Sequence, residues 1–199
     1  PTYQSGLKLT YLLDADTTLQ LHLNNGWRMI SEQDTAKAFG FQLAHNPTPH
    51  VTFLVNSFVG KELGMRRRVL QEFAGRLRLS DKVQVAGIYH FGFENKEDLK
   101  TIFIWQGFAA FARYEFTPKL SATARVDGQF DRNQVLAKTG TPNGFTVMSY
   151  TLGSNYHLSS YMDWRLEYRE RHSKDDLFPS KSFDRKYDHA VMTALALWF

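Results

Sequence analysis

Cysteine is absent from the 199-residue sequence, so the chain can form neither a disulfide nor a thiolate metal site. No run of about 18 apolar residues is present either, which excludes a transmembrane helix. The sequence has no glycine-rich phosphate loop and no pair of histidines at the His-x-x-x-His spacing of a helical metal site. The common signatures of disulfide scaffolds, helical membrane proteins and nucleotide- or metal-dependent enzymes are therefore missing.

The seven histidines do not form a catalytic or metal-binding group. They are spread over different segments, and we expect them to be solvated or interfacial: His22, His45, His50, His90, His157, His172 and His189. Asp188 and His189 are adjacent, so on a strand their side chains point to opposite faces. We therefore expect no catalytic, metal-binding or cofactor-binding residue, no cofactor and no enzymatic activity.

The sequence is rich in aromatic residues, and apolar residues alternate regularly with small or charged ones. Phe, Tyr and Trp make up 15% of the chain, and β-barrels use such residues as girdles at the two membrane interfaces. The last seven residues follow a strand pattern and end on Phe199, and ten earlier segments also have an apolar residue at every second position. Eleven such strands are typical of an outer-membrane β-barrel, in which alternate side chains face lipid and lumen.

The expected strands are joined alternately by short turns and by longer polar connections. The turns are rich in Pro, Asp, Ser and Asn, as tight reversals require. Outer-membrane barrels place short turns in the periplasm and longer loops outside, so the C-terminus is expected in the periplasm. The strands are expected at residues 3–13, 18–27, 37–45, 51–61, 68–78, 83–93, 102–116, 120–131, 145–156, 161–171 and 187–199. The longer connections are 28–36, 62–67, 94–101, 132–144 and 172–186.

The strand count suggests that more of the barrel lies upstream. Bacterial single-chain barrels have even numbers of strands, and this chain starts at Pro1 without an initiator methionine or a signal peptide. We expect at least one missing strand. The predicted fold is all-β: an antiparallel up-and-down transmembrane β-barrel with about 11 strands in this chain. It forms a single outer-membrane domain over residues 1–199, as the C-terminal portion of a larger even-stranded barrel.

Residues 161–171 indicate which strand face meets lipid. Trp164 and Leu166 alternate with Arg165 and Glu167. A charge at the lipid face costs about 2–4 kcal/mol near the midplane, so the charged row must face the lumen. The same argument on other strands predicts a set of pore-lining residues: Arg76, Arg113, Arg125, Asp127, Asp163, Arg165, Glu167 and Arg169.

The closing strand carries the expected assembly signal. Leu195, Leu197 and Phe199 recur at every second position and are expected to face lipid. The terminal aromatic resembles the signal that the barrel-assembly machinery reads on outer-membrane proteins. We therefore expect that machinery to be a partner of this chain.

The polar lumen wall allows more than one function. It could line an aqueous pore, or its charges could form cross-strand ion pairs that hold and plug the barrel. We predict a porin-like channel for passive diffusion of ions or small hydrophilic solutes, with a mild preference for anions. The alternative is a structural barrel that docks or sheathes a partner protein. A soluble all-β binding protein such as a lipocalin conflicts with the long strands and the terminal Phe199.

The charge distribution indicates membrane partners and no nucleic acid. The net charge is +4, and the charges are interleaved along the chain. Expected partners are outer-membrane lipid and lipopolysaccharide, besides a second copy of the chain or an envelope protein. The three arginines at 66–68 are expected in an extracellular loop that touches anionic lipopolysaccharide, or at a solvated rim.

Three stretches of the sequence resemble a known family. They are Asn24-Asn25-Gly26-Trp27, residues 110–120 (AFARYEFTPKL) and residues 164–169 (WRLEYR). They are similar, in the same order, to the NGW, ARYxFTxKL and RLEYR stretches of the OmpL-like β-barrel porin family, also called outer-membrane β-barrel porin type 2. The resemblance implies a porin-like outer-membrane channel and carries over no catalytic residue. Members are usually longer than this chain, in agreement with missing N-terminal strands.

Overall fold

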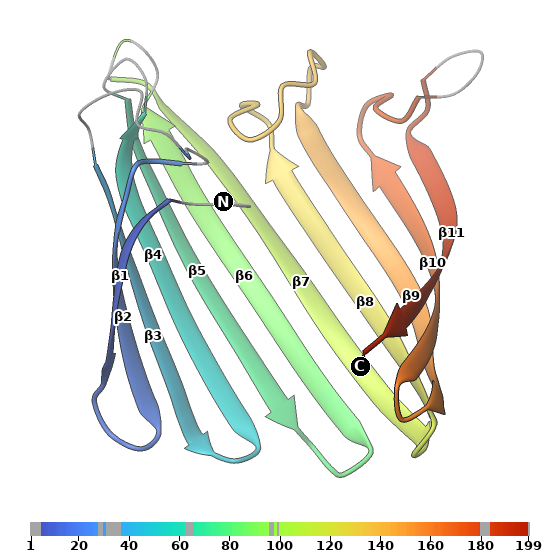
Figure 1. The fold of residues 1–199 in the computed structure, drawn as a ribbon. Helices are drawn as coiled ribbons and strands as arrows, with labels where there is room; N and C mark the ends of the chain where they lie inside the picture. Colours follow the sequence, from blue (N-terminus) through green and yellow to red (C-terminus); the bar gives the residue numbers. More distant parts are fainter. Residues whose placement is uncertain are drawn as a thin grey trace. The chain divides into compact units, whose positions relative to one another are not determined.

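A computed structural model describes residues 5–27, 30, 37–62, 66–95, 98, 100–179 and 184–198 of the chain. All helix or strand elements in these residues are β-strands, and they follow one another without a helix (Figure 1). The strands are β1 (Gly6–Leu12), β2 (Thr17–Asn24), β3 (Ala38–Thr48), β4 (Val51–Glu62), β5 (Arg66–Arg78), β6 (Val83–Asn95), β7 (Ile102–Thr117), β8 (Leu120–Asp131), β9 (Phe145–Ser159), β10 (Met162–Ser173) and β11 (Tyr187–Leu197).

Each strand pairs with its neighbours in the sequence, in the order β1 to β11. The pairings of β1–β4 and of β8–β11 are antiparallel and extend over most of each strand. Strands of up to 16 residues, as in β7, are much longer than the average of about 5–6 residues in globular proteins. The predicted eleven-strand, antiparallel, up-and-down fold is confirmed.

Three of the expected turns are tighter than predicted, one of them because β7 continues to Thr117 and leaves only residues 118 and 119 before β8. β3 continues to Thr48, because Thr48 pairs with Val51 beyond a bulge that follows His45. β9 continues to Ser159, so the next turn contains only residues 160 and 161. The expected long connection at 62–67 is also shorter, since β4 ends at Glu62 and β5 begins at Arg66.

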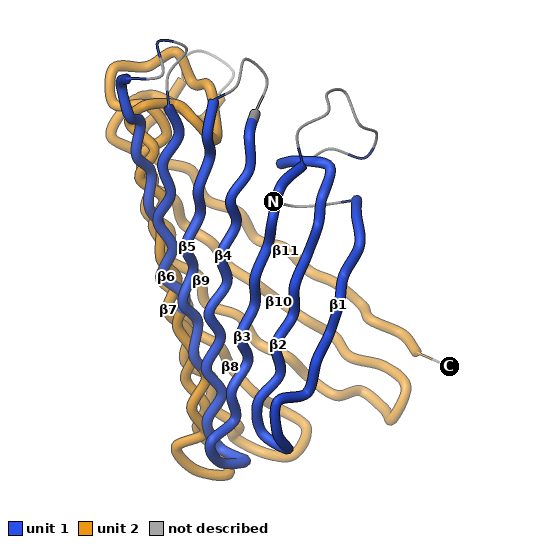
Figure 2. The backbone as a smooth tube through the Cα atoms, turned by 90° about the vertical axis from the view of Figure 1, so that its left-hand side faces the viewer, with its two compact units in different colours: residues 1–75, 88–106 blue, residues 76–87, 107–199 orange. Residues whose placement is uncertain are grey.

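The chain divides into two compact units (Figure 2). Unit 1 contains residues 1–75 and 88–106, with β1–β4 and parts of β5, β6 and β7. Its short turns between β1 and β2 and between β3 and β4 lie at one end, and the end of β2 and the start of β3 lie at the other end (Figure 2). Unit 2 contains residues 76–87 and 107–199, with the remainder of β5–β7 and all of β8–β11.

Apolar side chains are exposed far more often than they are buried. The buried apolar residues among those described are Ala38, Phe58, Trp105, Val147 and Phe178. Large apolar residues stay exposed along one face of the strands, from Leu7 at 75% in unit 1 to Val191 at 70% in unit 2. A soluble protein hides such a surface, so these strands are built for an apolar surrounding. In the described part of the chain no helix has the length and apolarity needed to cross a membrane.

Candidate functional site

Strand β10 in unit 2 separates its side chains into an apolar and a polar face. Trp164 and Leu166 are 45% and 40% exposed on the apolar face. Arg165 and Glu167 alternate with them and therefore lie on the polar face. The same two faces continue over β9 and β8. Paired residues of neighbouring strands point to the same face, and the pairings join β10 to β9 and β9 to β8.

The polar face of unit 2 contains a row that joins two of the predicted arginines. Thr151 of β9 pairs with Arg125 of β8 on one side and with Arg169 of β10 on the other side. Nη2 of Arg125 donates a hydrogen bond of 3.1 Å to Oγ1 of Thr151. Thr151 therefore lies between Arg125 and Arg169 in the register of the sheet, and its hydroxyl contacts the guanidinium of Arg125.

Acidic side chains neutralise these arginines along the same strands. Every predicted pore-lining arginine of β7, β8 and β10 has a carboxylate two residues away on the same face. The ion pairs are Arg113–Glu115 at 3.3 Å, Arg125–Asp127 at 2.9 Å, Arg165–Asp163 at 3.6 Å and Arg169–Glu167 at 2.8 Å. These four pairs lie within single strands. The expected cross-strand ion pairs also occur, since Arg171 of β10 pairs with Asp188 of β11. The polar face thus alternates in sign and has little net charge.

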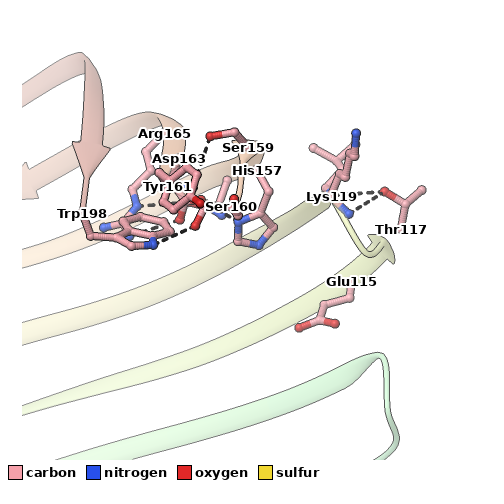
Figure 3. A network of polar contacts seen from close by, with 12 residues as sticks. Glu115, Thr117, Lys119, His157, Ser159, Ser160, Tyr161, Asp163, Arg165 and Trp198 are labelled. Atoms are coloured by element: carbon pink, nitrogen blue, oxygen red, sulfur yellow. Dashed lines mark hydrogen bonds and ion pairs between the residues drawn. The ribbon is translucent and has the colours of Figure 1, made fainter.

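A polar hollow of about 340 Å³ lies across β7–β10, and its lining includes Arg113, Asn155 and Asp163. Nδ1 of His157 lies 2.5 Å from Oδ1 of Asp163, and Nε of Arg165 donates a 3.0 Å hydrogen bond to Asn155. Asp163 is buried, and Figure 3 shows it beside His157 and Arg165 near the β9–β10 turn. The sequence pattern places His157 in a turn, as a solvated or interfacial residue, but it belongs to β9 and contacts a predicted pore-lining carboxylate.

The remaining predicted arginine, Arg76, lies on β5. It follows Glu72 by four residues, so both lie on the same face of that strand. In unit 1 the polar face carries a chain of hydrogen bonds from Gln42 to Asn56 at 2.7 Å and from Asn56 to Glu72 at 2.8 Å. These three side chains line a hollow of about 350 Å³. The polar residues that the sequence predicted on β5 thus extend to β3 and β4.

One part of the polar face of unit 1 is packed rather than solvated. Arg68 is buried against Glu94, with which it forms an ion pair, and its guanidinium lies 5.1 Å from the ring of Trp27 and 6.0 Å from the ring of Trp105. Trp105 is 1% exposed and fits there because residue 92 is glycine. A Cβ atom at Gly92 would lie 2.2 Å from Trp105 Cζ2.

This packed cluster corrects two expectations. The arginines at 66–68 do not form a loop, since all three belong to β5. Arg66 and Arg68 both contact Glu94, and Arg67 between them is exposed and points to the opposite face. The predicted polar wall also contains aromatic side chains here, which the alternation of polar and apolar residues did not indicate.

The closing strand β11 carries Leu195 and Leu197 on one face, at alternate positions. Leu195 and Leu197 are 55% and 64% exposed. Trp198 follows them and is held by two hydrogen bonds to the β9–β10 turn, from its Nε1 to the Ser160 carbonyl at 2.8 Å and from its backbone N–H to the Tyr161 carbonyl at 3.1 Å (Figure 3). Phe199, the last part of the predicted assembly signal, lies outside the described residues.

The connection between β8 and β9 is organised by a buried carboxylate. Asp131 is 0% exposed, and its side chain accepts hydrogen bonds from the backbone N–H groups of Val135 at 2.9 Å, Leu136 at 2.7 Å and Ala137 at 3.2 Å. The sequence predicted this segment only as a long polar connection. Three backbone donors on one carboxylate make it a defined loop.

A second carboxylate joins this loop to the connection between β10 and β11. Asn143 donates to Asp175 twice, from its side chain at 2.8 Å and from its backbone N–H at 2.7 Å. These two hydrogen bonds hold the pKa of Asp175 below its ordinary value, because they stabilise the charged form. These two hydrogen bonds therefore clamp the β8–β9 connection of unit 2 to its β10–β11 connection.

The described residues contain no group of three or more His, Asp or Glu side chains placed to hold a metal ion. His157 and His172 each lie beside a carboxylate, Asp163 and Glu170 respectively. The arrangement is thus a two-faced sheet with paired charges on one face and exposed apolar side chains on the other, which is the cross-section of an outer-membrane barrel wall.

Comparisons with known proteins agree with this class. The chain matches the family described as "Putative beta-barrel porin-2, OmpL-like" over residues 1–199. It therefore belongs to the OmpL-like family of outer-membrane β-barrel porins, and the resemblance seen in the sequence is confirmed. A search of curated proteins finds no matching sequence.

Three solved structures share the fold at low sequence identity. The NanC porin matches with a TM-score of 0.56 and 9% identity, covering 99% of this chain and 97% of that chain. OmpT of Vibrio cholerae and OccK11 (OpdR) of Pseudomonas aeruginosa both match with a TM-score of 0.63 and 12% identity. Each covers 96% of this chain, and this chain spans 63% and 59% of theirs. The chain is accordingly an outer-membrane β-barrel protein of the porin class.

Proposed function

We propose that this chain forms the wall of a water-filled channel through which ions or small hydrophilic solutes diffuse passively. The observation that carries the proposal is the two-faced sheet of unit 2. Ion-paired arginines and carboxylates cover one face of β8–β10, and exposed apolar residues such as Leu152, at 65%, cover the other. Placing so many charged side chains in lipid would be costly even when they are paired, because the desolvation of an ion pair can exceed the attraction within it, so the charged face belongs in water.

Single-channel recording in a planar lipid bilayer tests this function. The refolded full chain should produce discrete conductance steps, and a denatured sample of the same preparation should produce none. Steps that are absent from correctly folded protein would contradict the channel. Folding is checked independently by the heat-modifiable mobility of the barrel in gels.

A second candidate is a closed structural barrel that docks or sheathes an envelope partner protein. The packing of Arg68, Glu94, Trp27 and Trp105 on the polar face of unit 1 favours it, because buried side chains there leave less room for water. Conductance separates the two functions: the closed barrel gives no steps. The proposed channel carries no catalytic residue, and the porin family to which the chain belongs agrees with a non-enzymatic role.

We further propose that the C-terminus lies in the periplasm and that the chain is a single barrel domain assembled by the barrel-assembly machinery. The short turns at residues 13–16, 49–50 and 160–161 then face the periplasm, and the longer connections face outward. Cysteines introduced at Lys138 and at Lys119 test the orientation. In intact cells a membrane-impermeant maleimide should label Lys138→Cys and not Lys119→Cys, and the reverse pattern would contradict the orientation.

A further inference from the structure

A glycine on the polar face of unit 2 creates the hollow of about 340 Å³ that crosses β7–β10. Gly153 of β9 lines it, and pairs with Thr123 of β8 and with Glu167 of β10. A Cβ atom at residue 153 would meet only two backbone oxygen atoms, at 3.6 and 3.9 Å, which is ordinary van der Waals contact. The backbone there has no positive φ that would require glycine. The hollow therefore exists because residue 153 has no side chain.

Two hydroxyl groups of β8 border the hollow. Ser121 and Thr123 line it, and neither side chain forms a hydrogen bond with another of the described residues. Ser121 is buried, and a buried hydroxyl without a partner is uncommon. Each hydroxyl can donate one hydrogen bond and accept others. The volume equals that of about 11 water molecules at roughly 30 Å³ each, which is room for a solute with a single ring.

Arg165 of β10 carries the least neutralised charge of the hollow. Its side chain is 58% exposed, its Nε donates to Asn155, and its Nη2 lies 3.6 Å from Asp163, beyond hydrogen-bond distance. Asp163 is itself buried and lies 2.5 Å from His157. The two Nη atoms of Arg165 thus form no hydrogen bond within the described part of the chain and can donate to a solute.

A second guanidinium group faces the hollow from the opposite side. Arg113 belongs to β7, and β8 and β9 lie between β7 and β10. Its side chain is 42% exposed and contacts Glu115 at 3.3 Å. A guanidinium group has five N–H donors, so this one contact leaves donors of Arg113 unused.

The carboxylates of the hollow are matched within the wall. Glu167 lines it and forms an ion pair of 2.8 Å with Arg169, and Asp163 is buried beside His157. The charge that the hollow offers to a solute is therefore mainly that of its two guanidinium groups. Glu167 can still accept hydrogen bonds from hydroxyl groups, since a carboxylate has about four lone-pair sites.

We propose that this hollow binds a small carboxylate that also carries hydroxyl groups, such as a sugar acid. Arg165 binds the carboxylate, because a guanidinium group forms charge-assisted and often bidentate hydrogen bonds with it. Ser121, Thr123 and Glu167 bind the hydroxyl groups, and Arg113 supplies further donors. The inference rests on the channel proposed above, because the solute reaches the hollow through the water on the polar face.

Ligand-observed NMR on the refolded full chain in detergent micelles measures this binding without requiring conduction. The probes are glucuronate, glucose, which lacks the carboxylate, and cyclohexanecarboxylate, which lacks the hydroxyl groups. The unmodified chain should bind glucuronate about tenfold or more tightly than either other probe. Absence of glucuronate binding would overturn the site. Equally tight binding of glucose or of cyclohexanecarboxylate would overturn the assignment to a hydroxylated carboxylate.

Charge variants test the two arginines. Arg113→Gln/Arg165→Gln removes both guanidinium groups, and the control Arg132→Gln/Lys138→Gln removes the same charge from exposed positions in the β8–β9 connection. The first variant should bind glucuronate about tenfold or more weakly, and the control should bind it unchanged. Unchanged affinity in the first variant, or an equal loss in the control, would overturn the site.

A change at Gly153 tests the space without altering charge. Gly153→Gln fills the hollow with a neutral side chain, whereas Gly153→Ala adds only the Cβ atom that fits beside the backbone. The first variant should lose glucuronate binding and the second should retain it, which separates a site in the hollow from a general attraction of anions to the wall. Normal binding by folded Gly153→Gln would overturn the site, and heat-modifiable gel mobility confirms folding of each variant.

Failure of this site and failure of the channel are distinguishable, because conductance is recorded from the same preparations. A folded chain that conducts ions but does not bind glucuronate contradicts only the site. A folded chain that binds glucuronate selectively but gives no conductance steps contradicts only the channel.

Discussion

Arg125 and Arg169 lie on either side of Thr151 in one row of the polar face of unit 2, and each forms an ion pair with a carboxylate two residues away on its own strand. In an aqueous passage this arrangement places both signs of charge at each level of the wall. Charges in a narrow passage act on ions more strongly than charges on an open surface. Ion selectivity is therefore expected to depend on small local imbalances rather than on a large net charge.

Charge reversal at the arginines should shift selectivity toward cations. Arg125→Glu, Arg165→Glu and Arg169→Glu each leave two carboxylates together, and the reversal potential in a salt gradient measures the result. Asp127→Asn is the matched opposite change and should shift the reversal potential toward anions. An unchanged reversal potential in all four variants would indicate that these groups act only as ion pairs within the wall, which favours the structural barrel.

Adjacent residues of β10 should respond very differently to substitution. Leu166→Arg introduces a charge on the apolar face, at a cost of about 2–4 kcal/mol near the bilayer midplane. Glu167→Gln changes the polar face and removes one partner of Arg169, so it should cost about 1 kcal/mol or less. The folded fraction, measured by heat-modifiable gel mobility after refolding into lipid, should fall strongly for the first variant only. Equal losses would mean that the assigned facing of β10 is wrong.

The alternation of apolar and polar residues predicted the strands well, because every residue of a membrane-spanning strand must suit either lipid or the lumen. Each strand of a membrane barrel must present apolar side chains to lipid at every second position, so the pattern persists along its whole length. The expected strand 120–131 has the same bounds as β8. The expected strand 68–78 begins two residues later than β5. Arg66 and Arg67 are successive charged residues, which is typical of a loop, although in β5 their side chains already point to opposite faces.

Contacts between strands could not be predicted in the same way. The period assigns a face to each residue, but the partner of a side chain depends on register and on rotamer. His157 and Asp163 meet across a turn that the sequence placed three residues too early. Trp105 occupies the polar face because Gly92 on the neighbouring strand leaves space for its ring. Neither contact can be predicted from the sequence of a single strand, although a glycine in a strand interior often marks the close approach of a neighbouring group.

Removing the buried carboxylate of Asp131 should release the β8–β9 loop. Asp131→Ala leaves three backbone N–H groups without their acceptor, and each such charge-assisted hydrogen bond is worth about 1.5–3 kcal/mol. Trypsin cleavage after Lys138, in folded protein, should accelerate about tenfold or more. Asp176→Asn, an exposed carboxylate in another loop, is the control and should leave the rate unchanged. An equal rate in Asp131→Ala would contradict the clamp.

The second clamp should be sensitive to acid. Hydrogen bonds from Asn143 hold the pKa of Asp175 below its ordinary value of 3.8, so this carboxylate is more acidic in the folded loop than in the unfolded chain. Its contribution to stability is therefore complete above pH 3.8 and is lost as the pH falls through the lowered pKa. Hydrogen exchange of the Asn143 amide should increase over that acidic range in the unmodified chain. Asp175→Asn should show fast exchange already at neutral pH, and slow exchange in that variant would contradict the clamp.

Deletion of Phe199 should block assembly without changing the polar face. Leu195 and Leu197 present an exposed apolar row, and Trp198 is fixed to the β9–β10 turn by two hydrogen bonds. Trp198 thus fixes the end of the closing strand next to the β9–β10 turn, and we expect the assembly machinery to read the aromatic residue that follows it in the sequence. The deletion and Phe199→Asp should both lower the amount of folded barrel in outer-membrane fractions, whereas refolding of the same chains into lipid in vitro should remain efficient. Trp198→Phe keeps an aromatic ring, so it is the control and should assemble normally. Normal yield of the deletion in cells would show that the closing strand assembles without this residue.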